Sequence, residues 1–231
     1  MKSLCEQFDA LIVLDTETTG IAMERDEIIE LGAVRLHREG FDYAPEQELS
    51  CLISLSPGRR LPPEITRLTG ITPEMLAQQG IEKQAAAQQL QALLAGERVL
   101  VVAYNAQFDL NFLYYFLARC GCASCLQQVK FLDALTVYRD RRPYPHRLEN
   151  AIDAYGLGDT AVNSHRAVDD AMATVALLRA MATEKDDLSH YVNLFGYHPK
   201  YGVSGKRIRS IHYCAQPFQS QAPLYTLAAC T

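Results

Sequence analysis

The sequence predicts a mixed α/β domain followed by a C-terminal extension. Short runs rich in β-branched residues alternate with amphipathic stretches along most of the chain. Hydrophobic residues make up 48% of the 231 positions, which is enough for one sizeable core. We expect residues 1–187 to form the domain. Residues 188–231, richer in Gly and Tyr and basic in charge, are expected to be an extension that does not fold alone.

Apolar runs predict the first strands, and a change of period predicts the first helix. The expected strands lie at 10–15, 27–36 and 48–54. In 82–96 the apolar residues recur at helical spacing, and Gly96 follows as a C-cap. This segment is therefore expected to be a helix.

The second half continues the alternation. We expect strands at 98–103 and 131–133, and helices at 107–119, 148–155 and 167–183. Charged residues then interrupt the pattern at 184–187, and the extension begins.

Composition limits the class of protein. No stretch approaches the roughly 18 apolar residues that a membrane helix needs, and the first nine residues lack the apolar core of a signal peptide. We expect a cytoplasmic protein without membrane contact. Seven cysteines, most of them isolated, fit reduced thiols. Cys120, Cys122 and Cys125 are either a thiol-bearing turn or a zinc site that lacks a fourth ligand.

The formal charge of −5 gives no overall basic field. Basic residues nevertheless cluster at 139–147, which holds four arginines, and at 196–231, which holds four basic residues and no acidic one. Such clusters are either solvated surface or local attractors of phosphate groups.

The first candidate site residues end a buried strand. In "ALIVLDTETTG", Asp15 and Glu17 are two positions apart, so in a strand both project from one face. About one D-x-E pair is expected by chance in a chain of this composition. The pair alone therefore does not indicate a site, and the other acidic residues must support that interpretation.

A third carboxylate follows another buried strand. Asp109, in "AYNAQFDLNFL", lies near the start of the helix expected at 107–119. An aspartate in a first helical turn is also favoured by the helix dipole alone.

The fourth comes from "HRAVDDAMATVALL". At about 100° per residue, Asp170 flanks the apolar stripe of the expected helix, whereas Asp169 points nearly opposite. We therefore expect Asp170 in a site and Asp169 in solvent. His165 immediately precedes this helix.

Four converging carboxylates need a cation among them. One pair at 4 Å repels by about 4 kcal/mol at an effective dielectric of 20. Oxygen ligands favour Mg²⁺ or Mn²⁺, whereas Zn²⁺ would require more His or Cys.

These segments resemble one known family. "VLDTETTG", "NAQFDLNFL" and "HRAVDDA" are similar to the three motifs of the DEDDh branch of the DEDD 3′–5′ exonucleases, which includes the proofreading subunit of bacterial replicative polymerase. The resemblance covers roughly residues 8–183. It implies a ribonuclease-H-like fold, with a central mixed sheet flanked by helices. Tyr104 and Thr69 depart from residues common in the family.

Carried over position by position, the resemblance implies roles for five residues. Asp15, Glu17, Asp109 and Asp170 would hold two ions, and His165 would be the general base. Thr18 and Phe108 are expected beside the substrate, although both are equally good core residues.

The expected activity is the release of nucleoside 5′-monophosphates from 3′ ends of single-stranded DNA, alone or with a polymerase or repair complex. An exoribonuclease acting on RNA ends or short oligoribonucleotides is the alternative, because sequence does not resolve how the 2′-OH is read. A catalytically inactive nucleic-acid-binding or scaffolding module is a third hypothesis. All five catalytic residues are present, which argues against it.

Overall fold

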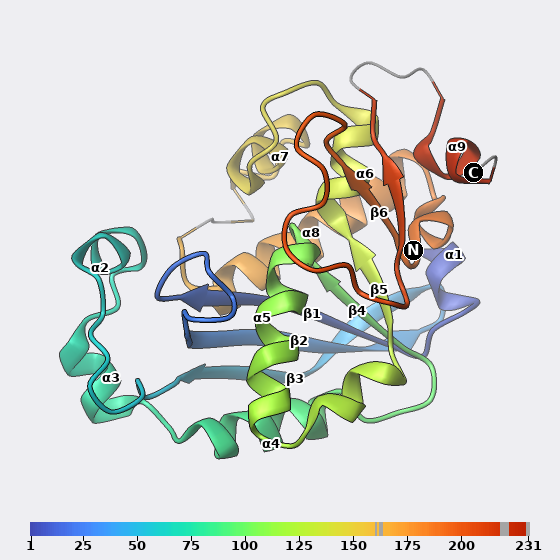
Figure 1. The fold of residues 1–231 in the computed structure, drawn as a ribbon. Helices are drawn as coiled ribbons and strands as arrows, with labels where there is room; N and C mark the ends of the chain where they lie inside the picture. Colours follow the sequence, from blue (N-terminus) through green and yellow to red (C-terminus); the bar gives the residue numbers. More distant parts are fainter. Residues whose placement is uncertain (160, 162–163, 218–221, 230–231) are drawn as a thin grey trace.

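The computed structural model describes residues 1–159, 161, 164–217 and 222–229. Its centre is a five-stranded mixed sheet in the order β3-β2-β1-β4-β5 (Figure 1). The strands are β1 (Ala10–Thr18), β2 (Ile28–Glu39), β3 (Asp42–Leu52), β4 (Val99–Ala103) and β5 (Lys130–Asp133). β1, β4 and β5 run parallel, and β2 is antiparallel to both of its neighbours. The carboxyl ends of the three parallel strands therefore meet at one edge.

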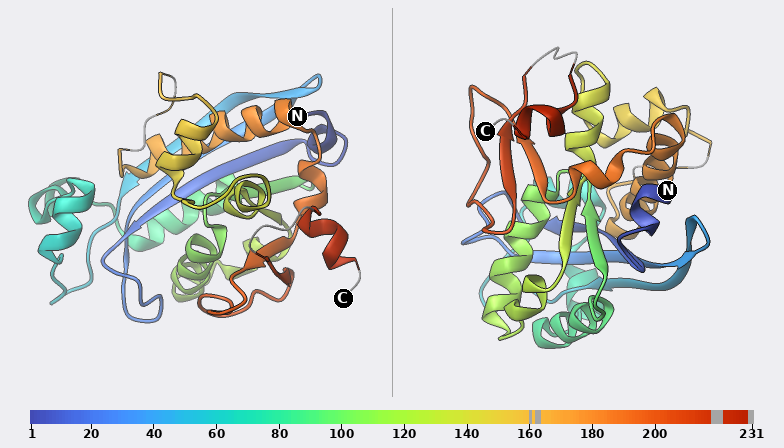
Figure 2. Two further views of the ribbon diagram at one scale, coloured as in Figure 1. Left: turned by 90° about the horizontal axis from the view of Figure 1, so that it is seen from above. Right: turned by 90° about the vertical axis from the view of Figure 1, so that its right-hand side faces the viewer.

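Helices cover both faces of this sheet, and the alternation of β1 side chains explains why. Leu11 and Val13 pack into a core with α8 (Ala167–Glu184), and Ile12 and Leu14 pack into a second core on the opposite face. The helices of the second face are α4 (Lys83–Leu93) and α5 (Ala106–Arg119). Figure 2 shows α8 on one side of the sheet, with α7 (Leu148–Ala154) beside it, and α4 and α5 on the other. The predicted strands and helices are thus all present, with shifted ends.

The prediction for the third strand, at 48–54, was wrong at its beginning. β3 starts at Asp42, in a hairpin with β2 in which Glu39 is opposite Asp42. Residues 42–47 are mostly polar and exposed because β3 is an edge strand, so backbone pairing on one side holds them without an apolar pattern. Pro45 lies at a register shift, as expected for proline on an edge.

Several elements before residue 188 were not predicted. They are α1 (Lys2–Cys5), α2 (Pro63–Thr69), α3 (Pro73–Gln79), the 3₁₀ helix η1 (Ala123–Gln127) and α6 (Ala134–Arg141). In Figure 1, α2 and α3 lie to one side of the sheet. They share a small core with β2 and β3, in which Ile29, Leu52 and Ile71 are buried.

The C-terminal segment, residues 188–229 as described, packs on the rest of the chain. It contains the 3₁₀ helix η2 (Leu188–Tyr191), the parallel strands β6 (Leu194–Tyr197) and β7 (His212–Ala215), and α9 (Leu224–Ala228). Its apolar side chains enter both cores: Leu188, Tyr191, Leu194, Cys214 and Leu224 enter the α8 core, and Phe195 and Ile211 the other.

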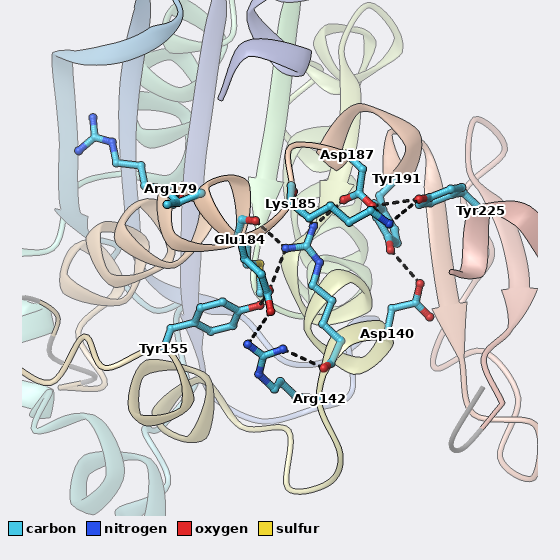
Figure 3. Close-up of polar contacts among 12 residues, drawn as sticks. Asp140, Arg142, Tyr155, Arg179, Glu184, Lys185, Asp187, Tyr191 and Tyr225 are labelled. Atoms are coloured by element: carbon cyan, nitrogen blue, oxygen red, sulfur yellow. Dashed lines mark hydrogen bonds and ion pairs between the residues drawn. The ribbon is translucent and has the colours of Figure 1, made fainter. Parts of the chain in front are cut away.

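Polar contacts fasten the beginning of this segment. Arg141 on α6 forms ion pairs with Asp187 and Glu184, and Asp187 also accepts a hydrogen bond from the Tyr225 hydroxyl at 3.0 Å. Asp140 accepts one from Tyr191 at 2.8 Å. Figure 3 shows the side chains of Asp187 and Tyr225 in contact, and those of Tyr191 and Asp140 beside them.

None of the helices in the described part of the chain is long and apolar enough to span a membrane.

Candidate active site

The predicted catalytic side chains line one cavity of about 500 Å³ beyond the carboxyl ends of the parallel strands. The lining includes Asp15, Glu17, Asp109, His165, Asp170 and Phe108. These residues come from β1, α5 and the approach to α8, which are far apart in the sequence. The structure therefore brings together all five residues predicted to be catalytic.

β1 supplies two of the carboxylates and fixes a third. Asp15 and Glu17 project from one face of the strand, as predicted, and Thr16 between them points to the other. The Thr16 hydroxyl donates a hydrogen bond of 2.7 Å to Oδ1 of Asp109. The strand and the first turn of α5 are thereby tied together at the cavity.

The start of α5 is held by a residue of β5. Asn105, at the N-cap, has a left-handed backbone with φ of 67°. The buried carboxylate of Asp133 accepts a hydrogen bond of 3.0 Å from the backbone N–H of Ala106, and it also caps α6 by accepting from the N–H of Leu135. Asp133 thus positions the helix turn that carries Asp109.

The start of α8 is seated on β2 by two residues. The buried carboxylate of Glu30 accepts hydrogen bonds from Arg166, at 2.7 and 2.9 Å, and from the backbone N–H of Ala167, at 3.0 Å. Gly32 lies directly under this turn: a Cβ there would come within 2.2 Å of backbone atoms of Ala167 and Val168. A close approach of α8 to the sheet places Asp170 beside Asp15 and Glu17.

His165 and Asp170 meet Glu17 above this turn. One ligand atom from each of the three residues lies within 4.8 Å of the others. His165 is exposed on the loop and has φ of 54°, and Asp170 is buried and accepts a hydrogen bond of 3.2 Å from the Ser164 N–H. Asp169 is exposed and pairs with the Ser164 hydroxyl at 2.6 Å. Asp169 thus faces solvent and Asp170 lines the cavity, while the role of Asp170 in the site stays a prediction.

Burial, with the charge of neighbouring carboxylates, makes the four carboxyl groups harder to ionise. Burial, and then the charges of Asp109, Glu17 and Asp170, hold the pKa of Asp15 well above its usual range. Burial followed by neighbouring carboxylates raises the pKa of Glu17 to about 8. Burial raises the pKa of Asp109 to about 7 despite its hydrogen bond from Thr16. It raises that of Asp170 to about 6, against the favourable charge of His165.

This donor set fits divalent cations. Among the residues that the structure describes, none of the four carboxylates forms an ion pair with a lysine or arginine, since the nearby Arg166 is bound to Glu30. Glu17, His165 and Asp170 are also the one group of three or more potential metal ligands that converges in the described chain. Hard oxygen ligands of excess negative charge are what a divalent-metal site requires.

Comparison with known proteins identifies the family. A family model described as an exonuclease, RNase T, matches residues 12–178, which is well over half of the chain. The chain belongs to this exonuclease family. DNA polymerase III subunit epsilon of Treponema pallidum is 32% identical over 187 residues, which are 80% of this chain and 82% of that protein.

Other relatives are much longer. DNA polymerase III PolC-type of Clostridium perfringens is 34% identical over 171 residues, which cover 74% of this chain and 11% of that protein. Among solved structures, Escherichia coli exonuclease I in complex with a dA16 oligonucleotide matches with a TM-score of 0.69 and 21% identity, over 79% of this chain and 42% of that one. This likeness confirms the ribonuclease-H-like fold. The prediction of a 3′–5′ exonuclease, and thus of a phosphodiester hydrolase, is confirmed by the family and its relatives.

Of the two residues expected beside substrate, only Phe108 lines the exonuclease cavity. Its ring lies 4.8 Å from that of Phe112, and it is half-buried. Thr18 is buried outside the lining, with its hydroxyl donating to the Gly20 carbonyl at 2.6 Å. Thr18 therefore supports the turn after β1.

The cysteine cluster lies apart from the exonuclease site. Cys122 is buried, and its Sγ contacts the Cys120 carbonyl at 3.4 Å, while the Cys120 Sγ contacts the Lys83 carbonyl. Within the described residues these three thiols do not form a group that converges on one point.

Sequence reasoning did not find the positioning residues of this exonuclease. Glu30 had a signal, since it is a charged residue inside the apolar run "EIIELGAV". Asp133 had another, because aspartate before "ALT" is a typical N-cap. Leu68, on α2, also lines the cavity and had none, since α2 reaches the site only through the tertiary fold.

Proposed function

We propose that this exonuclease removes nucleoside 5′-monophosphates from 3′ ends of single-stranded DNA, with two Mg²⁺ or Mn²⁺ ions held by Asp15, Glu17, Asp109 and Asp170. The observation that carries the proposal is the set of four carboxylates in one cavity, beside His165, none of which forms an ion pair with a lysine or arginine of the described residues. DNA is favoured over RNA because the relatives in the comparison are named as DNA polymerase subunits. We also propose that the protein acts in the cytoplasm, together with a polymerase or repair complex.

The chemistry that a pair of divalent ions supplies at such a site is the activation of a water and the neutralisation of charge on the departing 3′ oxygen. The residues of the chain hold and orient the reacting groups. Glu17 and Asp170 lie within ligand distance of each other, and Thr16 fixes the carboxylate of Asp109. Their preset geometry lowers the entropy lost when the phosphodiester is aligned.

His165 is proposed to take the proton of the attacking water at one of its ring nitrogens. It lies on an exposed loop, so it can pass the proton to solvent. His165 lies beside Glu17 and Asp170, within reach of a nucleophilic water held near these carboxylates.

The test follows the length of labelled substrates. A 5′-labelled DNA oligomer and its RNA counterpart are incubated with protein that a chelator has freed of metal, and Mg²⁺ or Mn²⁺ is then added. We expect metal-dependent shortening of the DNA from its 3′ end, with nucleoside 5′-monophosphate as the product. Faster shortening of the RNA would replace the proposal by an exoribonuclease, and no release with either metal would indicate an inactive binding module.

A matched pair of variants ties that activity to the cavity. Asp170→Asn removes one buried carboxylate of the site, and Asp169→Asn removes its exposed neighbour. We expect the first to lose activity by orders of magnitude and the second to retain it. Equal activity of the two variants would contradict the assignment of the metal ligands.

A further inference from the structure

A second, larger cavity adjoins the candidate active site. It has a volume of about 1080 Å³ and is bounded by the end of α6, the segment 142–147 and the C-terminal segment around β6. Arg147 lines both this cavity and the active-site cavity, so the two are neighbours at that residue. We call the larger cavity the arginine–tyrosine groove.

The segment 142–147 is fastened to the active site. The hydroxyl of Tyr104, which also lines the active-site cavity, donates a hydrogen bond of 2.9 Å to the backbone carbonyl of His146. Leu148 follows directly and is buried in the core. This wall of the groove is therefore held at a fixed position relative to the carboxylates of the active site.

The groove carries positive charge that the described residues neutralise only in part. Arg141 and Arg142 are bound to Glu184 and Asp187. The side chain of Arg139, in contrast, forms no ion pair or hydrogen bond with any residue in the described ranges, and within them the side chain of Arg147 has only an exposed contact of 3.5 Å with Glu149.

The acidic residue of the lining is already engaged. Asp140 accepts a hydrogen bond from the Tyr191 hydroxyl (Figure 3). It also accepts one from the backbone N–H of Leu224, so its carboxylate is bound to the C-terminal segment. The lining holds four arginines and this one aspartate, so its net charge is positive and suits phosphate groups.

Exposed aromatic rings accompany these arginines. The side chains of Tyr144 and Tyr201 are 78% and 74% exposed, an unusual state for large rings in a folded protein. Tyr144 lies on the segment 142–147, and Tyr201 follows β6. Each is held by one neighbouring ring: His146 at 5.8 Å for Tyr144 and His198 at 4.5 Å for Tyr201. Aromatic faces interleaved with basic side chains are how proteins bind single strands without reading sequence.

We propose that the arginine–tyrosine groove binds the nucleotides on the 5′ side of the one being removed, with Tyr144 and Tyr201 stacking on bases and Arg139 and Arg147 contacting phosphates. The inference rests on the proposed exonuclease function. Residues that the family model does not match form one wall, since the model ends at residue 178 and Tyr201 lies beyond it. The groove is thus a substrate-binding feature added by the C-terminal segment.

The experiment compares oligothymidylates of about four and about sixteen nucleotides, the range of site sizes on single-strand binders. For the unmodified protein we expect KM to be lower on the long oligomer. Tyr144→Ala, Tyr201→Ala and Arg139→Gln should each raise KM on the long oligomer about tenfold or more, with a smaller change on the short one. Arg139→Gln should also reduce the slope of log affinity against log salt concentration by about one.

Two matched controls lie outside the groove. Tyr114→Ala removes a ring that is 54% exposed on α5, and Lys130→Gln removes an exposed positive charge at the amino end of β5, opposite the site. We expect both to keep the length dependence of the unmodified protein. Circular dichroism of every variant verifies that it is folded.

The outcomes separate the two proposals. Equal KM values on both oligomers, or groove variants that behave like the controls, would overturn the groove while leaving the exonuclease function intact. Failure of the unmodified protein to degrade either oligomer would instead overturn the proposed function, and with it the groove.

Discussion

Four carboxylates in one cavity determine how the metal-free protein responds to pH. The pKa values of Asp170, Asp109 and Glu17 are raised to about 6, 7 and 8, from ordinary values of 3.8 for aspartate and 4.5 for glutamate. Between about pH 4.5 and pH 8 the native state therefore holds more protons at this site than the unfolded chain does. The free energy of unfolding contributed by these groups falls as pH rises through that window.

We predict that the chelated protein melts at a lower temperature at about pH 8 than at about pH 5. The carboxyl groups with lowered pKa values, such as Glu27 and Asp187, act in the opposite sense but below about pH 4.5, outside this window. Thermal unfolding followed by circular dichroism measures the effect. Mg²⁺ should raise the melting temperature more at pH 8, where the carboxylates are ionised.

Glu17→Gln is the control for this pH dependence. It removes the group with the highest pKa of the three without changing the size of the side chain. The variant should show a shallower decline between pH 5 and pH 8. A melting temperature that rises over this range in the chelated parent protein would contradict the raised pKa values.

His165 allows a second prediction at the scale of single residues. As a general base it should contribute about 10²- to 10⁴-fold to turnover, so His165→Ala should lower kcat by that factor. Metal-dependent stabilisation should persist, because the four carboxylates remain. His37→Ala, an exposed histidine on β2, is the control. Loss of metal binding in His165→Ala would instead identify His165 as a ligand.

Sequence reasoning was most successful at this scale because the functional residues follow local rules. Alternation along a strand placed Asp15 and Glu17 on one face, and helical period separated Asp170 from Asp169. The residues that hold them, Glu30 and Gly32, act across strands and helices. Their role depends on which helix crosses β2, and local pattern does not contain that information.

At the scale of elements, the absence of a side chain at Gly32 allows α8 to approach β2 closely. A methyl group at Gly32 would meet the backbone of Ala167 and Val168, which is unable to move aside as a flexible side chain would. We predict that Gly32→Ala lowers the free energy of unfolding by about 1–3 kcal/mol, the usual effect of overpacking. Displacement of Asp170 by about 1 Å should reduce kcat about 10²-fold.

The control for Gly32→Ala is Gly158→Ala. It adds the same methyl group where nothing lies within 4 Å. Urea unfolding and turnover of the two variants are compared with the parent protein. An unchanged kcat in Gly32→Ala would show that the close approach of α8 to β2 does not position the site.

The elements that were missed fall into two kinds. α3 and α6 had local signals: Thr72 caps α3 with Pro73 at its first position, and Asp133 caps α6. β6 and β7 had none, because each is four residues long and exists through parallel pairing with the other across a long connection. Short strands of this kind are specified by the tertiary fold.

At the scale of the whole molecule, the C-terminal segment is part of the packed structure. Its apolar side chains enter the cores on both faces of the sheet, and Phe195 and Tyr191 are among the largest fully buried residues. Whether the exonuclease unit ends at residue 187 stays a prediction. Deleting residues 188–231 would expose core surface, so point variants test this segment more cleanly than truncation does.

Asp187 lies where the C-terminal segment joins the rest of the chain, so a variant of this residue tests how that segment is held. It pairs with Arg141 where both side chains are 9% exposed, and it also contacts Lys185 and Tyr225. Removing the charge of one partner leaves Arg141 buried and incompletely compensated. We predict that Asp187→Asn lowers the free energy of unfolding by on the order of 3 kcal/mol, measured by urea denaturation.

Asp9→Asn is the matched control, because it makes the same chemical change in an exposed pair. Asp9 is 52% exposed at its side chain and contacts Arg38 and Arg98 at 3.4 and 3.6 Å. Exposed pairs contribute about 0–1 kcal/mol, so this variant should unfold close to the parent protein. If Asp187→Asn has the same free energy of unfolding as the parent protein, the ion pairs of Asp187 do not hold the C-terminal segment against α6. Its apolar contacts alone would then fix that wall of the arginine–tyrosine groove.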